Sequence, residues 1–377
     1  MAQHSASHTT CPQELIDLIL DEVDPTEKDT LKSLACALVA RSFRPTSQKL
    51  IFSDLTIDHD SILALQRLEV VLSASPHLAQ YSTISAAILS VLDNVKSLRT
   101  RIDNWHYLDS TCEQAIYALI TRSSLSSIEI DGATFQTNRQ LVTFLQCFPA
   151  SLESASLSKV FTNWTNLLSN SLQFEHQLRL TSLDLGTPDP VLFQWAIRAV
   201  DFRCLHVTFD DDAMDAIQRL LDVAINVETY HLSFYDCWPH AGSPNLEKMQ
   251  RLRTLEISVE LNWTEILQLA GQGEDNPLND AMRALATAPP TVEHLVLNLD
   301  IYNPDELPNF MGSAVLNDLD EGLPALQDVA LRIVSSYDDD AALQRGIRYV
   351  EAVFSRLHQR GMLTAIVVPR PNLNRIG

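Results

Sequence analysis

The chain has 377 residues, of which 46% are apolar and 20% are charged, enough to build a buried core. Its 48 acidic residues outnumber its 27 lysines and arginines, and the formal net charge is −21. Nucleic acids and anionic membranes bind surfaces of the opposite charge, so we expect neither as a partner. Only 10 residues are glycine, and no glycine-rich phosphate-binding loop occurs in the sequence. The composition therefore argues against a nucleotide-dependent enzyme.

The N-terminus and the cysteines indicate a compartment. Residues 1–10 are polar and lack the apolar core of a secretory signal, and we expect them to be disordered. The longest uncharged stretch with much apolar content, Tyr81–Leu92, is shorter than the ~20 residues that cross a membrane. None of the six cysteines belongs to a Cys-x-x-Cys pair, as is typical of free thiols in a reducing compartment. We therefore expect a cytoplasmic or nuclear protein.

Residues 11–58 predict three short helices followed by a strand. Pro12 is placed as a first helical residue, and Leu15, Ile19 and Val23 recur at intervals of four. Helices of this size cannot bury a core of their own, so they finish their burial against a partner or against the rest of the chain. The predicted elements are helices over Pro12–Val23, Thr30–Phe43 and Pro45–Phe52, and a strand over Asp54–Asp58.

These residues resemble an F-box, and are most similar to the F-box-like domains common in fungal proteins. The family opens Leu-Pro-x-Glu-Leu-Leu; Cys11 stands where the leading Leu is usual, Ile16 replaces the last Leu, and Phe43 stands where the family often has Trp. The resemblance covers about 45 residues. It implies docking on the Skp-type adaptor subunit of a cullin-based ubiquitin ligase. The residues that it assigns to this docking are Pro12, Leu15, Ile16, Ile19, Leu20, Val23, Leu38, Val39 and Phe43. The alternative is an N-terminal three-helix cap without such a partner.

The rest of the chain repeats one unit. Residues 59–94 predict a helical connection, and over residues 95–377 a phrase of the form apolar-x-x-apolar-x-apolar alternates with helical stripes at a mean spacing of about 30 residues. This spacing resembles degenerate leucine-rich repeats, in which each unit is a strand plus a helix that stacks on its neighbour. The copies begin at Val95, Leu125, Leu152, Leu180, Phe202, Val227, Leu252, Val292, Leu326 and Leu363.

The turn after each phrase lacks the Asn or Cys ladder of regular repeats, so each turn must be satisfied individually. We therefore predict an α/β fold, with an N-terminal three-helix F-box followed by an irregular leucine-rich-repeat-like solenoid, or horseshoe. Its parallel strands should follow sequence order. The rival architecture is a doubly wound α/β domain, which would have longer apolar strands and a phosphate loop. The ladder positions hold Ala133, Val160, Pro188, Asp210, Tyr235, Glu260, Asp300 and Val334.

Catalytic and metal chemistry finds little support in the sequence. The acidic runs Asp210–Asp212 and Asp338–Asp340 suggest metal ligands, but acids before a helix are explained by its dipole and its free N–H groups. Cys204 and His206 share one strand face, yet a zinc site or a nucleophilic pair needs further groups that the sequence does not indicate. We expect no enzyme activity, no catalytic residue, no metal and no cofactor, with an unrecognised hydrolase as the alternative.

The strand residues between the apolar positions should point outward, onto the concave face of the repeats. They are polar or acidic, so a partner patch carrying Lys or Arg is favoured, and protonating the histidines should soften that preference. The loops Asn104–Tyr107 and Phe234–His240 gather aromatics that serve either as interface anchors or as core cover. The predicted substrate-facing residues are His206, His231 and Glu256, with Tyr235 and Trp238 on the second loop. The other outward positions are Glu129, Asp131, Ser156, Asp184, Thr208, Ser233, Ser258, His294 and Asn298.

Taken with the F-box resemblance, the sequence predicts a substrate-recognition adaptor of an SCF-type ubiquitin ligase. The helices would dock on the Skp-type adaptor and the repeats would bind an unknown protein substrate. The alternative from another class is a protein-interaction scaffold whose F-box-like helices pack only internally.

Overall fold

A computed structural model describes the protein over residues 54–58, 95–101, 105, 108, 110–121, 124–162, 178–186, 189–209, 213–234, 243–261, 277–301, 305, 307–310, 319–335 and 340–369. All docking residues assigned by the F-box resemblance, from Pro12 to Phe43, lie outside these ranges. The predicted helical connection over residues 59–94 also lies outside these ranges, as do Tyr235 and Trp238 on the second aromatic loop.

The fold is α/β, with a parallel open sheet. The strands are β1 (Asp54–Asp58), β2 (Ser97–Arg101), β3 (Ser127–Phe135), β4 (Ser154–Thr162), β5 (Leu178–Leu185), β6 (Val200–Phe209), β7 (Thr229–Phe234), β8 (Thr254–Leu261), β9 (His294–Ile301), β10 (Asp328–Ser335) and β11 (Leu363–Pro369). The helices are α7 (Ser110–Ile120), α8 (Asn138–Gln146), α9 (Pro190–Ala199), α10 (Met214–Val223), α12 (Pro277–Ala286), α13 (Leu307–Phe310), α14 (Leu319–Gly322), α15 (Asp340–Val353) and α16 (Ser355–Gln359).

Each recurring phrase forms a strand, as predicted. In β9 the burial alternates strictly, because the apolar residues of the phrase and its continuation face the core and the residues between them face outward. The strand-like segment Asp54–Asp58 is also a strand. It pairs in parallel with β2, so a segment placed by sequence at the end of the F-box-like region is part of the repeat sheet.

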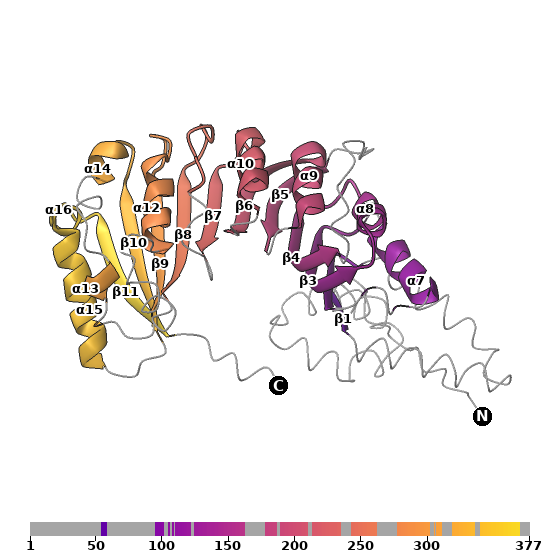
Figure 1. Ribbon diagram of the computed structural model, residues 1–377, viewed down its shortest axis with the longest axis horizontal. Helices are drawn as coiled ribbons and strands as arrows, with labels where there is room; N and C mark the ends of the chain where they lie inside the picture. The colour runs from indigo at the N-terminus through magenta and orange to yellow at the C-terminus, as the bar shows by residue number, and fades with distance from the viewer. Residues whose placement is uncertain are drawn as a thin grey trace, which may run out of the picture. The chain divides into compact units, whose positions relative to one another are not determined.

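The chain forms two compact units. The first comprises residues 1–131 and 147–152, in which β1, β2 and the start of β3 pair in that order. The second comprises residues 132–146 and 153–377, in which β4 to β11 follow one another in sequence order (Figure 1). Every strand pair with a defined register from β4 to β11 is parallel, which confirms the predicted strand order for the described strands.

A repeated backbone contact holds successive strands in register. The carbonyl of the second residue in one phrase accepts hydrogen bonds from two N–H groups at the start of the next phrase. The carbonyl of Glu228, for example, accepts from Arg253 N at 2.9 Å and from Thr254 N at 3.0 Å. Arg253 in turn accepts from Glu293 at 2.8 Å and from His294 at 2.9 Å. The sequence phrase therefore sets the register, because equivalent positions of each copy become neighbours.

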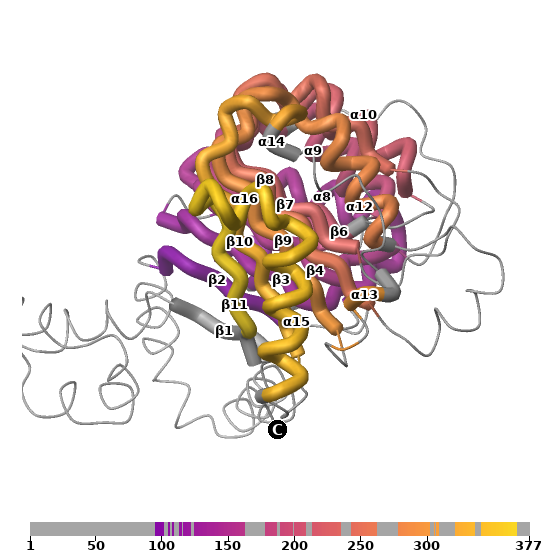
Figure 2. The backbone as a smooth tube through the Cα atoms, turned by 90° about the vertical axis from the view of Figure 1, so that its left-hand side faces the viewer, coloured from indigo at the N-terminus to yellow at the C-terminus, as the bar shows by residue number. Residues whose placement is uncertain are grey.

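In the second unit, helices α9, α10, α12 and α15 pack against one face of the sheet (Figure 2). The core lies between these helices and the strands, where Trp195, Leu205, Tyr230 and Leu232 are each at most 1% exposed. Helix α9 starts with Pro190, whose missing N–H costs nothing at that position. The opposite sheet face carries the half-exposed polar side chains described below.

Trp105, from one of the two aromatic loops left open by the sequence, lies in the first unit. Trp105 is 1% exposed, stacks on Tyr117 with ring centroids 6.2 Å apart, and donates from Nε1 to Glu113 at 3.3 Å. Trp105 is therefore a core residue of its unit rather than an interface anchor.

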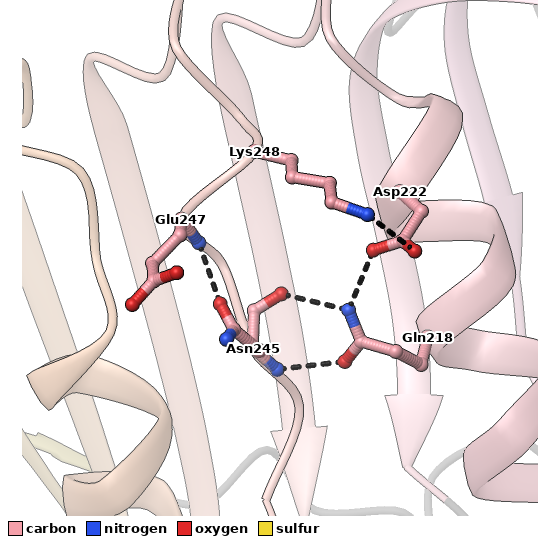
Figure 3. Close-up of polar contacts among 5 residues, drawn as sticks. All are labelled: Gln218, Asp222, Asn245, Glu247 and Lys248. Atoms are coloured by element: carbon pink, nitrogen blue, oxygen red, sulfur yellow. Dashed lines mark hydrogen bonds and ion pairs between the residues drawn. The ribbon is translucent and has the colours of Figure 1, made fainter.

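Individual side-chain hydrogen bonds are seen at one turn and between two helical connections. Asp189 is 6% exposed and caps α9 through Val191 N at 2.7 Å, while its other oxygen accepts from Thr162 N at 2.9 Å. On the helical side, the amide of Gln218 in α10 donates to Asn245 O at 3.1 Å and accepts from Asn245 N at 2.8 Å (Figure 3). Lys248 adds an ion pair with Asp222 at 2.7 Å. Side chains thus bridge one repeat to the next in place of a regular ladder.

Candidate functional site

The fifth residues of successive phrases are neighbours on the sheet face opposite the helices. The parallel register aligns Ser156 with Asp184, Asp184 with His206, His206 with His231, and His231 with Glu256. Since neighbouring strands lie about 4.8 Å apart, these five side chains form a line across β4 to β8. The repeat geometry brings together residues that are far apart in sequence.

A second line lies two residues further along each strand. Ser233 in β7 aligns with Ser258 in β8, which aligns with Asn298 in β9 and then with Arg332 in β10. Hydrogen bonds join the two lines into one network. We call the nine residues of both lines the polar row: Ser156, Asp184, His206, His231, Ser233, Glu256, Ser258, Asn298 and Arg332.

Asp184 anchors one end of the polar row. Its Oδ1 lies 2.8 Å from Nδ1 of His206, and its Oδ2 accepts a hydrogen bond from Ser156 Oγ at 2.8 Å. Burial alone would raise the pKa of Asp184, but the hydrogen bonds from His206 and Ser156 and the charge of a protonated His206 outweigh it, so the pKa lies below its ordinary value. The carboxylate is therefore ionised, and its closeness to Nδ1 of His206 favours a hydrogen on that nitrogen.

Two stacked histidines form the centre. The rings of His206 and His231 are 4.1 Å apart between centroids and 10° from parallel. Burial lowers the pKa of His231, the charge of His206 lowers it further, and Glu256 and Asp184 oppose both only in part, which leaves that pKa at about 4. At neutral pH His231 is therefore a neutral imidazole.

Buried hydroxyls link the histidines. Nε2 of His206 is 3.1 Å from Ser233 Oγ, and Nε2 of His231 is 3.3 Å from the same oxygen and 2.9 Å from Ser258 Oγ. Ser233 is 0% exposed and Ser258 is 7% exposed. Both serines lie on the sheet face that the sequence predicted for them. Larger side chains around the two serines cover them, however, so neither is exposed.

Glu256 anchors the other end. Its Oε1 accepts from Nδ2 of Asn298 at 2.6 Å and lies 3.7 Å from Nη1 of Arg332. Asn298 also donates to Ser258 Oγ at 2.9 Å, which connects Glu256 to the histidines. The side chains of Asp184, His206 and Glu256 keep 29%, 30% and 28% of their surface exposed, so the polar row is open to a partner at both ends.

The sheet face around the polar row is acidic. From the fifth phrase position onward, the described outward residues of β5 to β9 include no lysine or arginine. They include four carboxylates: Asp184, Glu256, Glu260 and Asp300.

Asp184, His206 and Ser233 stand in the order carboxylate, imidazole, hydroxyl, which is also the order of a serine nucleophile and its base. Ser233 is fully buried, however, so a substrate carbonyl has no path to its Oγ in this conformation. Cys204 is a half-buried free thiol on the same strand as His206. Within the described ranges, no group of three or more His, Cys, Asp or Glu residues is arranged to hold a metal ion. The arrangement is suited to hydrogen bonding and proton uptake.

Three predicted substrate-facing residues, His206, His231 and Glu256, thus occur in one network, whereas Tyr235 and Trp238 lie outside the described residues. Sequence reasoning did not pair Asp184 with His206, and it missed Arg332 altogether. The signal for the first was present, because Asp184 and His206 both hold the fifth position of adjacent phrases. The signal for Arg332 was present too, because Arg332 follows its phrase by one residue, as Ser233, Ser258 and Asn298 follow theirs.

No protein-family profile matches the chain, and no curated protein matches its sequence. Among the helices of the described segments, none has the length and apolar character that would let it cross a membrane.

Proposed function

We propose that this chain is the substrate-recognition adaptor of a cullin-RING ubiquitin ligase of the SCF type, acting in the cytoplasm or the nucleus. In this proposal residues 11–58 are an F-box that docks on the Skp-type adaptor. The repeats form a degenerate leucine-rich-repeat horseshoe that binds the substrate protein. The observation that carries the binding role is the polar row, a half-exposed hydrogen-bonding surface built from equivalent positions of adjacent repeats.

Binding explains the polar row better than bond-breaking chemistry does. A nucleophile must be reached by its substrate, and Ser233 is buried beneath the histidines. A recognition surface, by contrast, needs fixed side chains with exposed acceptors, which Asp184 and Glu256 supply. In an adaptor the protein contributes proximity and orientation, and a partner enzyme transfers ubiquitin. We therefore propose no catalytic residue, no metal and no cofactor for this chain.

The charge of the face suggests the chemistry of the substrate. Four carboxylates, Asp184, Glu256, Glu260 and Asp300, lie on this face, and the described outward positions of β5 to β9 from the fifth phrase position onward hold no lysine or arginine. Opposite charges steer association and suppress wrong partners. We propose that the substrate presents a patch that is rich in Lys or Arg.

The substrate side can be tested with a partner captured from cells. We expect the double variant Asp184→Asn, Glu256→Gln to weaken its binding several-fold and to flatten the dependence of binding on salt. The matched control is Glu293→Gln, which removes a charge at the second phrase position, where Glu293 pairs with Arg253 at 3.4 Å. Equal affinity of all three proteins would place the substrate elsewhere on the chain.

The ligase side depends on the apolar stripe of the F-box-like segment. Leu15→Asp puts an unpaired charge into the proposed interface and should cost several kcal/mol of docking free energy. The control Gln13→Asp adds the same charge outside the stripe. Co-purification with the Skp-type adaptor should be lost in the first variant and kept in the second.

The rival function is a protein-interaction scaffold without a ligase role. It predicts that neither the wild type nor Gln13→Asp co-purifies with the Skp-type adaptor, while the binding of other partners to the repeats persists.

A further inference from the structure

The buried hydroxyl of Ser233 limits how many protons the histidine pair can hold. Its oxygen contacts Nε2 of His206 at 3.1 Å and Nε2 of His231 at 3.3 Å. Ser233 is 0% exposed, so water cannot accept its hydrogen. A buried hydroxyl without an acceptor costs about 1–3 kcal/mol. At least one of the two rings must therefore keep an unprotonated Nε2 to receive that hydrogen.

The first proton has a defined place. Nδ1 of His206 lies 2.8 Å from Oδ1 of the Asp184 carboxylate, which favours a hydrogen on that nitrogen. A further proton on Nε2 makes His206 an imidazolium paired with that carboxylate. The new N–H then donates to Ser233 Oγ, and the Ser233 hydroxyl turns to donate to Nε2 of His231. Every buried donor keeps an acceptor in this singly protonated state.

A second proton has no such place. Protonating His231 gives both rings an N–H at Nε2, and the Ser233 hydroxyl then has no acceptor among its described contacts. Two cations would also stack with their centroids 4.1 Å apart, and like charges this close repel each other.

The charged groups around the pair act on the two rings unequally. Asp184 in β5 contacts His206, and Glu256 in β8 is the register neighbour of His231. Glu256 is itself drawn to Arg332 in β10, which lies 3.7 Å away. Cys204 in β6 stands two residues before His206. Among these groups only Asp184 makes a direct contact with a ring, so the stable charge belongs on His206.

We propose that His206 and His231 form a one-proton switch on the sheet face. His206 takes up a single proton beside Asp184, and the hydroxyl of Ser233 then turns to donate to Nε2 of His231. The first proton gives the ionised Asp184 an imidazolium partner and so changes the net charge of the face by one unit. The second proton breaks the polar row. If the proposed function holds, mild acid weakens the binding of a basic substrate; the switch itself requires no partner.

The proton positions can be measured on the full chain by NMR. With ¹⁵N-labelled histidine, the Nδ1 and Nε2 shifts of each ring report its protonation state as the pH is lowered from about 8 to about 4. Signals are assigned with His206→Gln and His231→Gln. We expect His206 to become an imidazolium first, while His231 stays neutral with Nε2 unprotonated until the lowest pH.

Ser233→Ala separates the switch from ordinary burial. Removing the hydroxyl removes the donor that needs an acceptor, so His231 should protonate about one pH unit higher than in the wild type. The matched control Ser154→Ala, in β4 on the same sheet, should leave both titrations unchanged. Simultaneous titration of the two rings in the wild type would overturn the proposal, and this readout does not depend on any variant folding. An unchanged His231 titration in a folded Ser233→Ala protein would overturn it as well.

Discussion

The stacked histidines predict a specific loss of folding stability in acid. The pKa of His231 is about 4 in the folded protein, against an ordinary value of 6.5. Between these values the unfolded chain binds a proton that the folded chain does not, so the free energy of unfolding falls as the pH falls from about 6.5 to about 4. A difference of about 2.5 pKa units corresponds to about 3 kcal/mol. Because His231 is only partly buried, solvent screening reduces the expected loss to about 1–2 kcal/mol.

The measurement compares wild type with His231→Asn, which cannot titrate. Urea unfolding followed by circular dichroism at several pH values gives the free energy of unfolding of each protein. The wild type should lose about 1–2 kcal/mol more than the variant between about pH 6.5 and about pH 4.5. His294→Asn is the matched control, since His294 lies on the same face but contacts Asp328 at 2.6 Å. A difference between wild type and His231→Asn that stays constant with pH would refute the reasoning.

Three further variants test the packing that supports the polar row. Gly186→Ala would place a Cβ 2.9 Å from Ser158 Cα and should cost about 1–3 kcal/mol, whereas Gly322→Ala, which meets no atom within 4 Å, should change thermal stability little. Asp189→Ala removes a helix cap together with buried hydrogen bonds and should lower stability by about 2–3 kcal/mol in urea unfolding. Gln218→Ala should cost about 1 kcal/mol in the same assay, and an unchanged midpoint would mean that this inter-repeat bridge contributes nothing.

Strand positions were predictable because the phrase combines spacing with burial. The phrase Val292–Leu297 predicted β9, and once strands are parallel and in register the neighbours of His206 follow from counting. The membership of Asp54–Asp58 in the sheet was not predictable, because that segment carries no repeat phrase and pairs with β2 across a long stretch of chain.

Side-chain contacts were less predictable than strands. The sequence placed Ser233 and Ser258 on the correct face but could not show that histidine and asparagine side chains would bend over them, because their rotamers depend on contacts with the adjacent strand. The aromatic loop with Trp105 stayed ambiguous for the same reason, since its burial depends on Glu113 and Tyr117 in a separate helix.

The most direct test of the adaptor proposal is ubiquitin transfer in a reconstituted ligase. The full chain, a Skp-type adaptor, the cullin and its RING subunit would be combined with the captured partner, and ubiquitin on that partner would be quantified. We expect ubiquitin transfer to be lost with Leu15→Asp and to be strongly reduced with the double variant Asp184→Asn, Glu256→Gln. A partner that binds the chain yet stays unmodified, in a ligase that is active toward a control substrate, would contradict it.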